Sequence, residues 1–485
     1  MLGGIVKENA LKQTGTTFGQ ETKLNNGNND HSASRKSLFP MELVDFEHYM
    51  LADDSPEFPM TIPVKLEMSG EVDRVAFESS FNLACARHPF SSVRVEEREG
   101  RFFWIASEPP KISWVDSLPD FVEIDLRNET GMKVFAKRED LGVSIFLVFH
   151  HSVTDGGGIA QFVEDWMIAY KRTGDVGEAI SMPLLKPDQL KNRGKLGMSL
   201  WQYLLRPVQE FCGAVGVAEY FSHRPVAMGP QRLDSGFSLG KKPGNRRFTF
   251  RFSASETKSL VSLSKQTKYP INDLLLAAYY SACQTWLEKN RPEDSDRHLR
   301  MMVPMNLRKE TEATLPMCNF VSMIFLDRKP GRSKTVRSVC WYVWLEMSAI
   351  KIMRLGYTFI HMIRVLRWLG WLPTLLRRDR SIATSLLSNM GRIYADSKLL
   401  NSESKIESRG LTLESMAFFP PVREFLWMSA LVSTYAGQMQ FSCSFCEDAI
   451  CRKDVESIME SLKQNLLDNF DMKKAKSSKS NGGPE

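Results

Sequence analysis

The sequence predicts a mixed α/β (α+β) fold made of two similar halves in tandem, and three observations support this. Strand-like and helix-like patterns alternate along the chain. The alternation starts near Leu38, weakens in a Pro- and Gly-containing stretch at 175–245, and then resumes. The chain has 485 residues, 43% of them hydrophobic, which is enough for two or three domains with cores of their own. This composition excludes wholesale disorder, collagen and a continuous coiled coil.

The first half begins with a strand and a helix. Residues 60–70 alternate between apolar and polar side chains, and 72–89 then have helical spacing. A hairpin is expected to turn at Glu99-Gly100. Residues 142–150 are nearly all apolar, which is typical of a central strand buried on both faces. The remaining expected elements are a short strand at 123–126, a strand at 133–140 and an amphipathic helix at 159–174.

The second half repeats this alternation. Phe248, Phe250 and Phe252 alternate as in a strand, and Ser253 with Glu256 matches a capping box at the start of a helix. Before this half, 199–215 has the apolar spacing of a single helix. A buried helix, two strands, a long helical stretch and a closing strand are expected at 272–290, 298–308, 319–327, 335–376 and 438–448.

These patterns divide the chain into five segments. Asn- and Ser-rich composition predicts flexible tails at 1–37 and 471–485. The two halves are expected at 38–190 and 245–470, with a connecting region at 191–244 between them.

Charge and cysteine content narrow the class of protein. A net charge of +6 over this length is too small to predict nucleic-acid binding. The eight cysteines show no disulfide framework, so reduced thiols in a cytoplasmic protein are expected. The start of the chain lacks the apolar core of a signal peptide, and no stretch reaches the roughly 18 apolar residues of a spanning helix.

The segment FLVFHHSVTDGGG (146–158) carries the strongest chemical signal. An apolar strand delivers His150 and His151 into a tight turn, and adjacent strand residues point to opposite faces, so only one of them can face a given cavity. A histidine titrates near neutral pH and can act as a general base. Asp155 can fix the loop, and Gly156 permits a sharp return of the backbone.

Other interpretations of these residues stay open. A His-His pair is often a surface or core feature, and Asp-Gly is a common turn. A metal site is disfavoured because adjacent strand histidines diverge and no third ligand stands at a supporting spacing. Cys443 and Cys446 have CxxC spacing, but on a strand positions three apart face opposite ways, so neither a metal site nor a redox pair is expected there.

The segment from His150 to Gly156 resembles the HHxxxDG signature of the CoA-dependent acyltransferase superfamily. Members include chloramphenicol acetyltransferase, nonribosomal peptide condensation domains, plant alcohol acyltransferases and wax ester synthase/diacylglycerol acyltransferases. The resemblance extends to the opening of the fold at 45–90, VPMNLR at 303–308, CNF at 318–320 and SNMGR at 388–392. It implies two chloramphenicol-acetyltransferase-like halves that form a V with a central channel.

The resemblance also implies roles for individual residues. His151 would be the general base that takes a proton from an acceptor hydroxyl or amine as this attacks a thioester. His150 and Asp155 would be structural, Asp155 through an arginine that the sequence does not identify. Gly156 would let the donor's arm pass close to the backbone. Ser388 and Asn389 would line the channel, and Asn389 would either stabilise the oxyanion or pack the strand.

The implied activity is that of an acyltransferase, most closely an acyl-CoA-dependent O-acyltransferase of lipid metabolism. The co-substrate would be acyl-CoA or a carrier-protein thioester, with no bound cofactor or metal. The acceptor is expected to be lipophilic, and the missing DFGWG motif of plant alcohol acyltransferases leaves its identity open. Because both halves lie in one chain, a monomer would suffice to form the complete channel. The alternative is a catalytically inactive, condensation-like binding or scaffold protein.

Residues 351–380 combine apolar and aromatic side chains with seven Lys and Arg and a single acid, Asp379. Such a stretch can lie in a membrane interface, which predicts possible peripheral membrane contact. The alternative is a long helix packed on the sheet with its arginines solvated.

Overall fold

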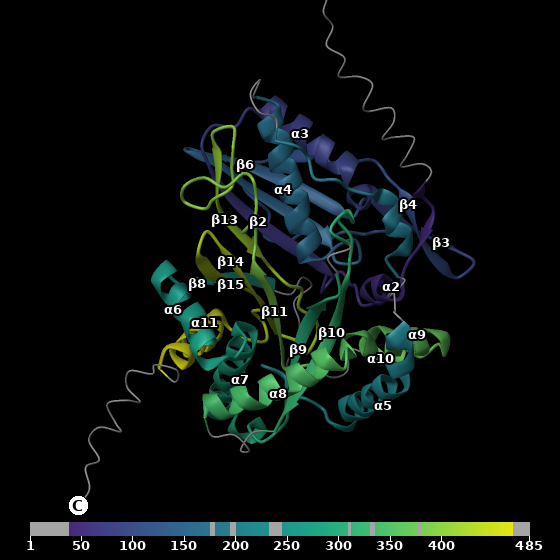
Figure 1. The fold of residues 1–485 in the computed structure, drawn as a ribbon, viewed down its shortest axis with the longest axis vertical. Helices are drawn as coiled ribbons and strands as arrows, with labels where there is room; N and C mark the ends of the chain where they lie inside the picture. The colour runs from purple at the N-terminus through teal and green to yellow at the C-terminus, as the bar shows by residue number, and fades with distance from the viewer. Residues whose placement is uncertain are drawn as a thin grey trace, which may run out of the picture.

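The computed structural model describes residues 38–174, 180–194, 200–231, 245–308, 312–329, 335–376 and 381–468. They form two lobes, each built on a six-stranded sheet, as Figure 1 shows. The tails predicted at 1–37 and 471–485 lie outside the described residues. Among the described residues, no helix has the length and apolar character needed to cross a bilayer.

The first lobe carries the sheet β12-β13-β2-β7-β6-β5 and a small sheet β1-β4-β3. Its strands β12 (Glu407–Ser408) and β13 (Leu411–Phe418) come from the second half of the chain. Helices α3 and α4 pack together across the larger sheet (Figure 1). The central strand β7 is buried along almost its whole length, as its apolar sequence predicts. The bounds are β1 Met41–Glu42, α2 Asp45–Ala52, β2 Thr61–Ser69, α3 Arg74–Arg87, β3 Val93–Arg98, β4 Arg101–Ala106, β5 Ile112–Trp114, β6 Met132–Glu139, β7 Gly142–His150 and α4 Gly156–Arg172.

The second lobe carries the sheet β10-β9-β11-β14-β15-β8. Helix α7 packs against both α8 and α11 beside it. The predicted capping box is confirmed, because Ser253 and Glu256 bond each other's backbone amides at the start of α6. The bounds in this lobe are α5 Leu200–Ser222, β8 Asn245–Arg251, α6 Ala254–Thr267, α7 Ile271–Asn290, β9 Leu299–Asn306, β10 Val321–Arg328, α8 Val336–Ile352, α9 Thr358–Trp368, α10 Leu372–Leu375, β11 Ser385–Arg392, β14 Met428–Tyr435, β15 Gln438–Cys446 and α11 Arg452–Asp468.

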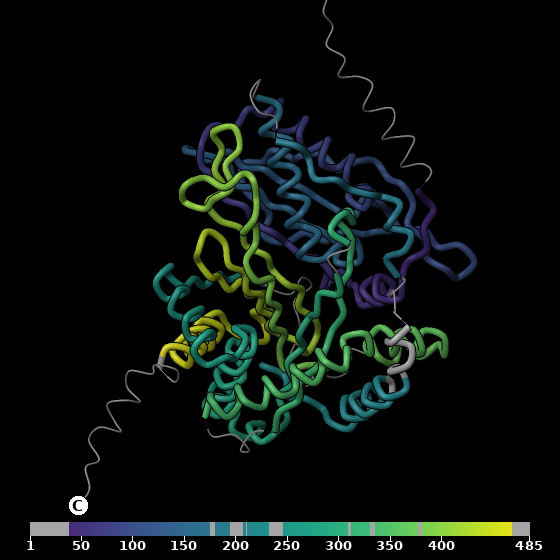
Figure 2. The backbone as a smooth tube through the Cα atoms, viewed as in Figure 1, coloured from purple at the N-terminus to yellow at the C-terminus, as the bar shows by residue number. Residues whose placement is uncertain are grey.

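Two parts of the second half cross into the first lobe. Strand β13 pairs antiparallel with β2, with Phe418 opposite Val64, and so extends the first sheet. The segment between β9 and β10 also reaches over, as the tube in Figure 2 shows. In this bridging segment (307–308 and 312–320), the Met317 amide donates to His88 Nδ1 at 3.0 Å. The lobes are therefore tied together by backbone as well as side-chain bonds.

Two sequence predictions about elements are wrong, and two strands were missed. The long helical stretch at 335–376 is broken into α8, a 3₁₀ turn, α9 and α10, because Arg354 is left-handed (φ 53°) and Gly370 has φ 72°. Residues 123–126 are not a strand: the Asp125 carboxylate accepts from Arg127 N and curls the chain. Strands β13 and β14 were not predicted from the sequence.

Candidate active site

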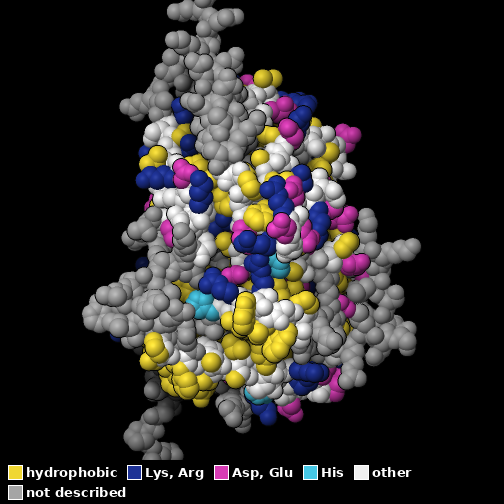
Figure 3. Space-filling view, turned by 90° about the vertical axis from the view of Figure 1, so that its right-hand side faces the viewer, with side chains coloured by type: hydrophobic (Ala, Val, Ile, Leu, Met, Phe, Trp, Pro, Cys, Tyr) yellow, Lys and Arg dark blue, Asp and Glu magenta, His cyan; other side chains and the backbone are white. Residues whose placement is uncertain are grey.

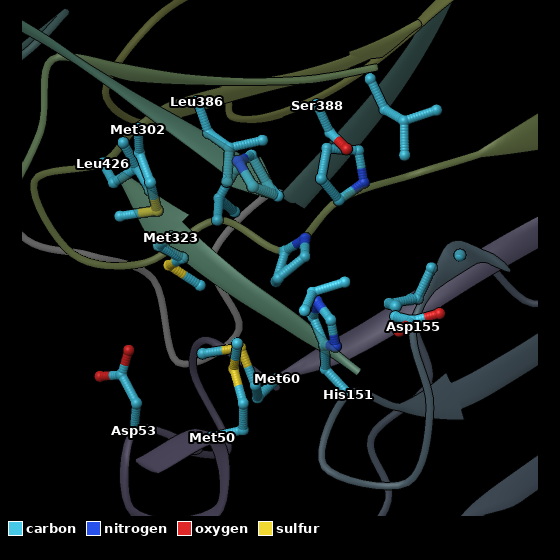
Figure 4. Close-up of a pocket in the computed structure, with 18 of the residues that line it drawn as sticks. Met50, Asp53, Met60, His151, Asp155, Met302, Met323, Leu386, Ser388 and Leu426 are labelled. Atoms are coloured by element: carbon cyan, nitrogen blue, oxygen red, sulfur yellow. The ribbon is translucent and has the colours of Figure 1, made fainter. Parts of the chain in front are cut away.

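The histidine pair stands where β7 ends, and the two rings point apart. The His150 ring is fully buried, and its Nδ1 accepts a hydrogen bond from Ser152 N at 3.1 Å. The His151 ring lines a cavity between the lobes (Figure 4). The backbone of His151 is held on both sides: its amide donates to Met60 O at 2.7 Å, and its carbonyl accepts from Asn319 Nδ2 at 2.6 Å.

The hydrogen bond at His151 Nδ1 fixes the tautomer of the ring. Nδ1 lies 3.1 Å from the carbonyl oxygen of Thr154, which can only accept, so Nδ1 carries the hydrogen. Nε2 is then left with its lone pair. Burial lowers the pKa of His151 below its ordinary value, and this outweighs the nearby Asp155 carboxylate, which acts to raise it. The ring is therefore a neutral base at neutral pH.

Both carboxylate oxygens of Asp155 accept hydrogen bonds from the protein. Its Oδ1 accepts from Gly158 N at 2.9 Å, which makes it the N-cap of α4. Its Oδ2 accepts from Phe320 N at 2.8 Å and from Arg308 Nη1 at 2.7 Å. Arg308 is the arginine that the sequence could not identify, and it stands at the end of the VPMNLR segment. The bridging segment thus clamps the turn that presents His151 (residues 151–155, hereafter the motif turn).

The cavity beside His151, hereafter the central cavity, has a volume of about 190 Å³ and draws its walls from both lobes. Figure 4 shows His151 and Asp155 on one side, with Met323, Met302 and Leu426 across from them. Its apolar lining includes five methionines: Met50, Met60, Met302, Met323 and Met390. Methionine is flexible and fills irregular apolar space, so this wall can adapt to different hydrocarbon shapes.

The other predicted site residues also reach the central cavity. Ser388 and Asn389 line it from β11, where Asn389 Oδ1 accepts from Gly391 N at 2.8 Å and Nδ2 donates to Asn272 Oδ1 at 3.3 Å. Gly156 faces Met390: a Cβ built on Gly156 would lie 2.9 Å from Met390 Sδ. The glycine therefore keeps space between the start of α4 and the cavity wall.

A buried ion pair at the edge of the central cavity was missed from the sequence. Arg423 Nη1 lies 3.1 Å from Asp53 Oδ2, and both side chains are almost completely buried. The two residues are 370 positions apart, and no local pattern links them. The pair joins the end of α2 to the loop after β13.

The cysteines offer no metal site in the described parts of the chain. No group of three His, Cys, Asp or Glu side chains there could hold a metal ion. Cys443 and Cys446 are both free and buried in β15. Burial raises the pKa of Cys443 to about 12 and that of Cys446 to about 11, so both are thiols at neutral pH.

Comparisons with known proteins identify the fold. No family model matches the sequence, and no curated protein matches it. The epimerization domain from the third module of tyrocidine synthetase B is 16% identical, with a TM-score of 0.62, over 90% of this chain and 98% of that one. The trichothecene 15-O-acetyltransferase of Fusarium sporotrichioides is 12% identical, with a TM-score of 0.65, over 88% and 95%.

The starter condensation domain of rhizomide synthetase, solved with C8-CoA, is 10% identical with a TM-score of 0.63, over 90% of this chain and 98% of that one. At such identities the likeness shows the fold. It confirms the predicted α/β class of two chloramphenicol-acetyltransferase-like halves, the fold that condensation domains, epimerization domains and acyltransferases share.

Proposed function

We propose that this protein is an acyltransferase in which His151 is the general base. It moves an acyl group from a CoA or carrier-protein thioester to a hydroxyl or amine. The observation that carries the proposal is the His151 ring, which lines a cavity between the lobes with its Nδ1 tied to a carbonyl. That bond leaves Nε2 as the proton acceptor.

The reaction can be written with the residues present. His151 Nε2 takes the proton of the acceptor hydroxyl or amine as that atom attacks the thioester carbonyl carbon. A tetrahedral oxyanion forms, and its collapse breaks the carbon–sulfur bond. The imidazolium returns the proton to the departing thiolate, so the base is regenerated and no acyl-enzyme is needed. Asn389 and Ser388, from the β11 side of the central cavity, are the proposed donors to the oxyanion.

The apolar, methionine-rich cavity supports a lipophilic substrate. The donor assignment draws on the relatives, because the rhizomide synthetase domain was solved with C8-CoA. Gly156 is proposed to keep the passage beside the motif turn open for the donor. His150 and Asp155 are proposed to support the motif turn without touching substrate.

The experiment that tests this proposal measures CoA release with a thiol reagent. Acetyl-, octanoyl- and palmitoyl-CoA are each mixed with a panel of alcohols and amines, and the wild type is compared with His151→Ala. We expect acceptor-dependent release that falls ~10²–10⁴-fold in the variant, the loss typical of a missing general base. His223→Ala, a histidine that does not line the central cavity, is the matched control. Unchanged release in His151→Ala would remove the role of that ring.

The alternative is a binding or scaffold protein that keeps this fold without turnover. It predicts that acyl-CoA binds, as measured by calorimetry, while no acceptor on the panel releases CoA. The intact histidine with its fixed tautomer and neutral state favours catalysis over this alternative.

The proposal extends to a lipid surface as partner. Figure 3 shows hydrophobic side chains gathered on the lower part of one face, and Phe211 of α5 with Trp368 and Trp371 around α9 are 70%, 82% and 60% exposed. Lys351 and Arg354 are exposed beside them. Aromatic side chains with basic neighbours suit the interface of an anionic bilayer.

Sedimentation with vesicles tests this contact. We expect the protein to sediment with phosphatidylcholine vesicles that contain phosphatidylglycerol, and the double variant Trp368→Ser, Trp371→Ser to lose most of that binding. Leu141→Ser, which removes an exposed apolar side chain of the other lobe, is the control. A stable dimer that buries the tryptophans, seen by light scattering, would instead assign this face to a second copy.

A further inference from the structure

We propose that a second cavity, lined by α5, β10, α8 and α9, binds the hydrocarbon tail of one substrate, and that Met323 is the gate between it and the central cavity. This rests on the proposed acyl transfer and names the substrate class: a thioester or acceptor with a long unbranched chain. The second cavity, hereafter the α5 cavity, has a volume of about 260 Å³.

Met323 is the residue that places the two cavities next to each other. It lines both the central cavity, with His151, and the α5 cavity, with Val217 and Phe325. A methionine side chain has three rotatable bonds and swings at low cost. Rotation of Met323 would therefore join the two spaces without movement of the backbone.

The material around this gate is aromatic and apolar. Tyr49, in the wall of the central cavity, packs edge-on against Phe359, in the wall of the α5 cavity, with ring centroids 5.4 Å apart. Phe359 in turn lies 5.4 Å from Phe325, which lies 4.8 Å from Tyr220. A chain that passes Met323 would contact ring faces and edges, which suits hydrocarbon.

Three acids line the α5 cavity: Glu219, Asp327 and Glu346. Asp327 is paired with Arg300 at 2.8 Å, and Glu346 is paired with Arg328, so neither of these two requires a cationic ligand in the cavity. Glu219 is exposed to solvent on α5. The lining that remains is mostly apolar, as expected of a site for an alkyl chain rather than for a charged group.

Size and continuity support a long chain. Each cavity alone is smaller than the ~300–1,000 Å³ typical of ligand sites, and the two together fall within that range. The α5 cavity also shares Gly213, Val217 and Met362 with a groove of about 690 Å³ between α5 and α9. That groove opens beside the exposed Trp371 and Phe221, so a longer tail has an apolar path to the surface.

The test compares two tryptophan substitutions one position apart on α5. Val217→Trp places a large ring where the α5 cavity and the groove meet, whereas Ala218→Trp adds the same ring at an exposed position outside both linings. We expect Val217→Trp to lower the ratio of kcat/KM for palmitoyl-CoA to that for acetyl-CoA by ~10–100-fold, the scale on which apolar pockets discriminate chain length. Met323→Ala, which widens the gate, should raise that ratio.

The same ratio is measured for long and short alcohol acceptors, because the tail can belong to either substrate. A change in either series supports the proposal and says which substrate occupies the α5 cavity. Equal ratios for Val217→Trp and Ala218→Trp in both series, with unchanged thermal unfolding, overturn it.

A readout without turnover separates this proposal from the acyltransferase assignment. Calorimetry gives the Kd of palmitoyl-CoA for the wild type and for Val217→Trp. If Val217→Trp binds palmitoyl-CoA more weakly but neither protein shows turnover, the tail site is supported and the acyltransferase assignment is refuted. If both proteins show turnover but do not differ in binding or in chain-length ratio, the acyltransferase assignment is supported and the tail site is refuted.

Discussion

The two sides of the central cavity differ in the interactions that hold them: hydrogen bonds and an ion pair on one side, and apolar packing on the other. On the His151 side, the motif turn is held by directed bonds: Asp155 to Arg308, Asp155 to the Phe320 amide, and Asn319 to the His151 carbonyl. On the opposite side, around Met302, Met323 and Leu426, the wall is apolar. The proposed base must keep one geometry to act, whereas a surface proposed to accept hydrocarbon need only exclude water and fill space. The comparison predicts that polar substitutions on the first side cost much and apolar ones on the second cost little.

The largest effect is expected at Arg308. Arg308→Ala leaves the nearly buried Asp155 carboxylate without its cationic partner, and breaking such a pair costs ~3–5 kcal/mol. Urea unfolding should show this loss relative to the wild type. Arg308→Lys is the control, because it keeps a charge that can reach Asp155 but loses the second donor, Nη2, which bonds the Cys318 carbonyl, and it should retain part of the stability. Equal, small losses in both variants would mean that the clamp is not what holds the motif turn.

Asn319 tests whether the bonds on this side position the base as well as stabilise the fold. Asn319→Ala removes the 2.6 Å bond to the His151 carbonyl, so we expect kcat to fall ~10-fold while stability falls by only ~1 kcal/mol. Ser322→Ala is a matched control from the adjacent strand, since its buried hydroxyl has no hydrogen-bond partner among the described residues. A KM increase with unchanged kcat would place Asn319 in binding instead of in positioning.

Arg308 and Asn319 also illustrate which parts of the site the local sequence could predict and which it could not. The apolar run of β7, the divergent histidines and the helix after the motif all follow from neighbouring residues, although α4 begins at Gly156 and not at the expected residue 159. The partner of Asp155 lies 153 positions away, and β13 joins a strand some 350 positions earlier. Such pairs depend on how the lobes meet, which no periodicity encodes. Likewise the methionines that line the central cavity come from separate elements, and no local pattern around any one of them predicts that they meet.

The pH dependence of kcat/KM tests the motif turn through His151, and the expected effect is smaller. Burial lowers the pKa of His151, so the ring is neutral at pH 7 and kcat/KM should stay level as pH rises from there. On acidification the rate should fall only below the ordinary histidine value of about 6.5, by up to tenfold per pH unit.

The stability of the fold should depend on pH in the same range, because His88 is also buried with a lowered pKa. Both native histidines resist protonation, so stability is full above about pH 6.5 and is lost as pH falls below it. An acid limb of kcat/KM centred above pH 6.5 would contradict a lowered pKa at His151.

The smallest effect is expected across the cavity, at Met302. Met302→Leu conserves volume and apolar character on the adaptable wall, so it should change stability by less than ~1.5 kcal/mol. Its effect should appear in selectivity: a branched side chain has fewer shapes than methionine, so the range of acyl chains accepted should narrow while the best substrate keeps its rate. The measurement is kcat/KM across acetyl-, octanoyl- and palmitoyl-CoA, beside urea unfolding. A loss as large as that of Arg308→Ala would show that this wall is as tightly specified as the motif turn, and the contrast between the two sides would disappear.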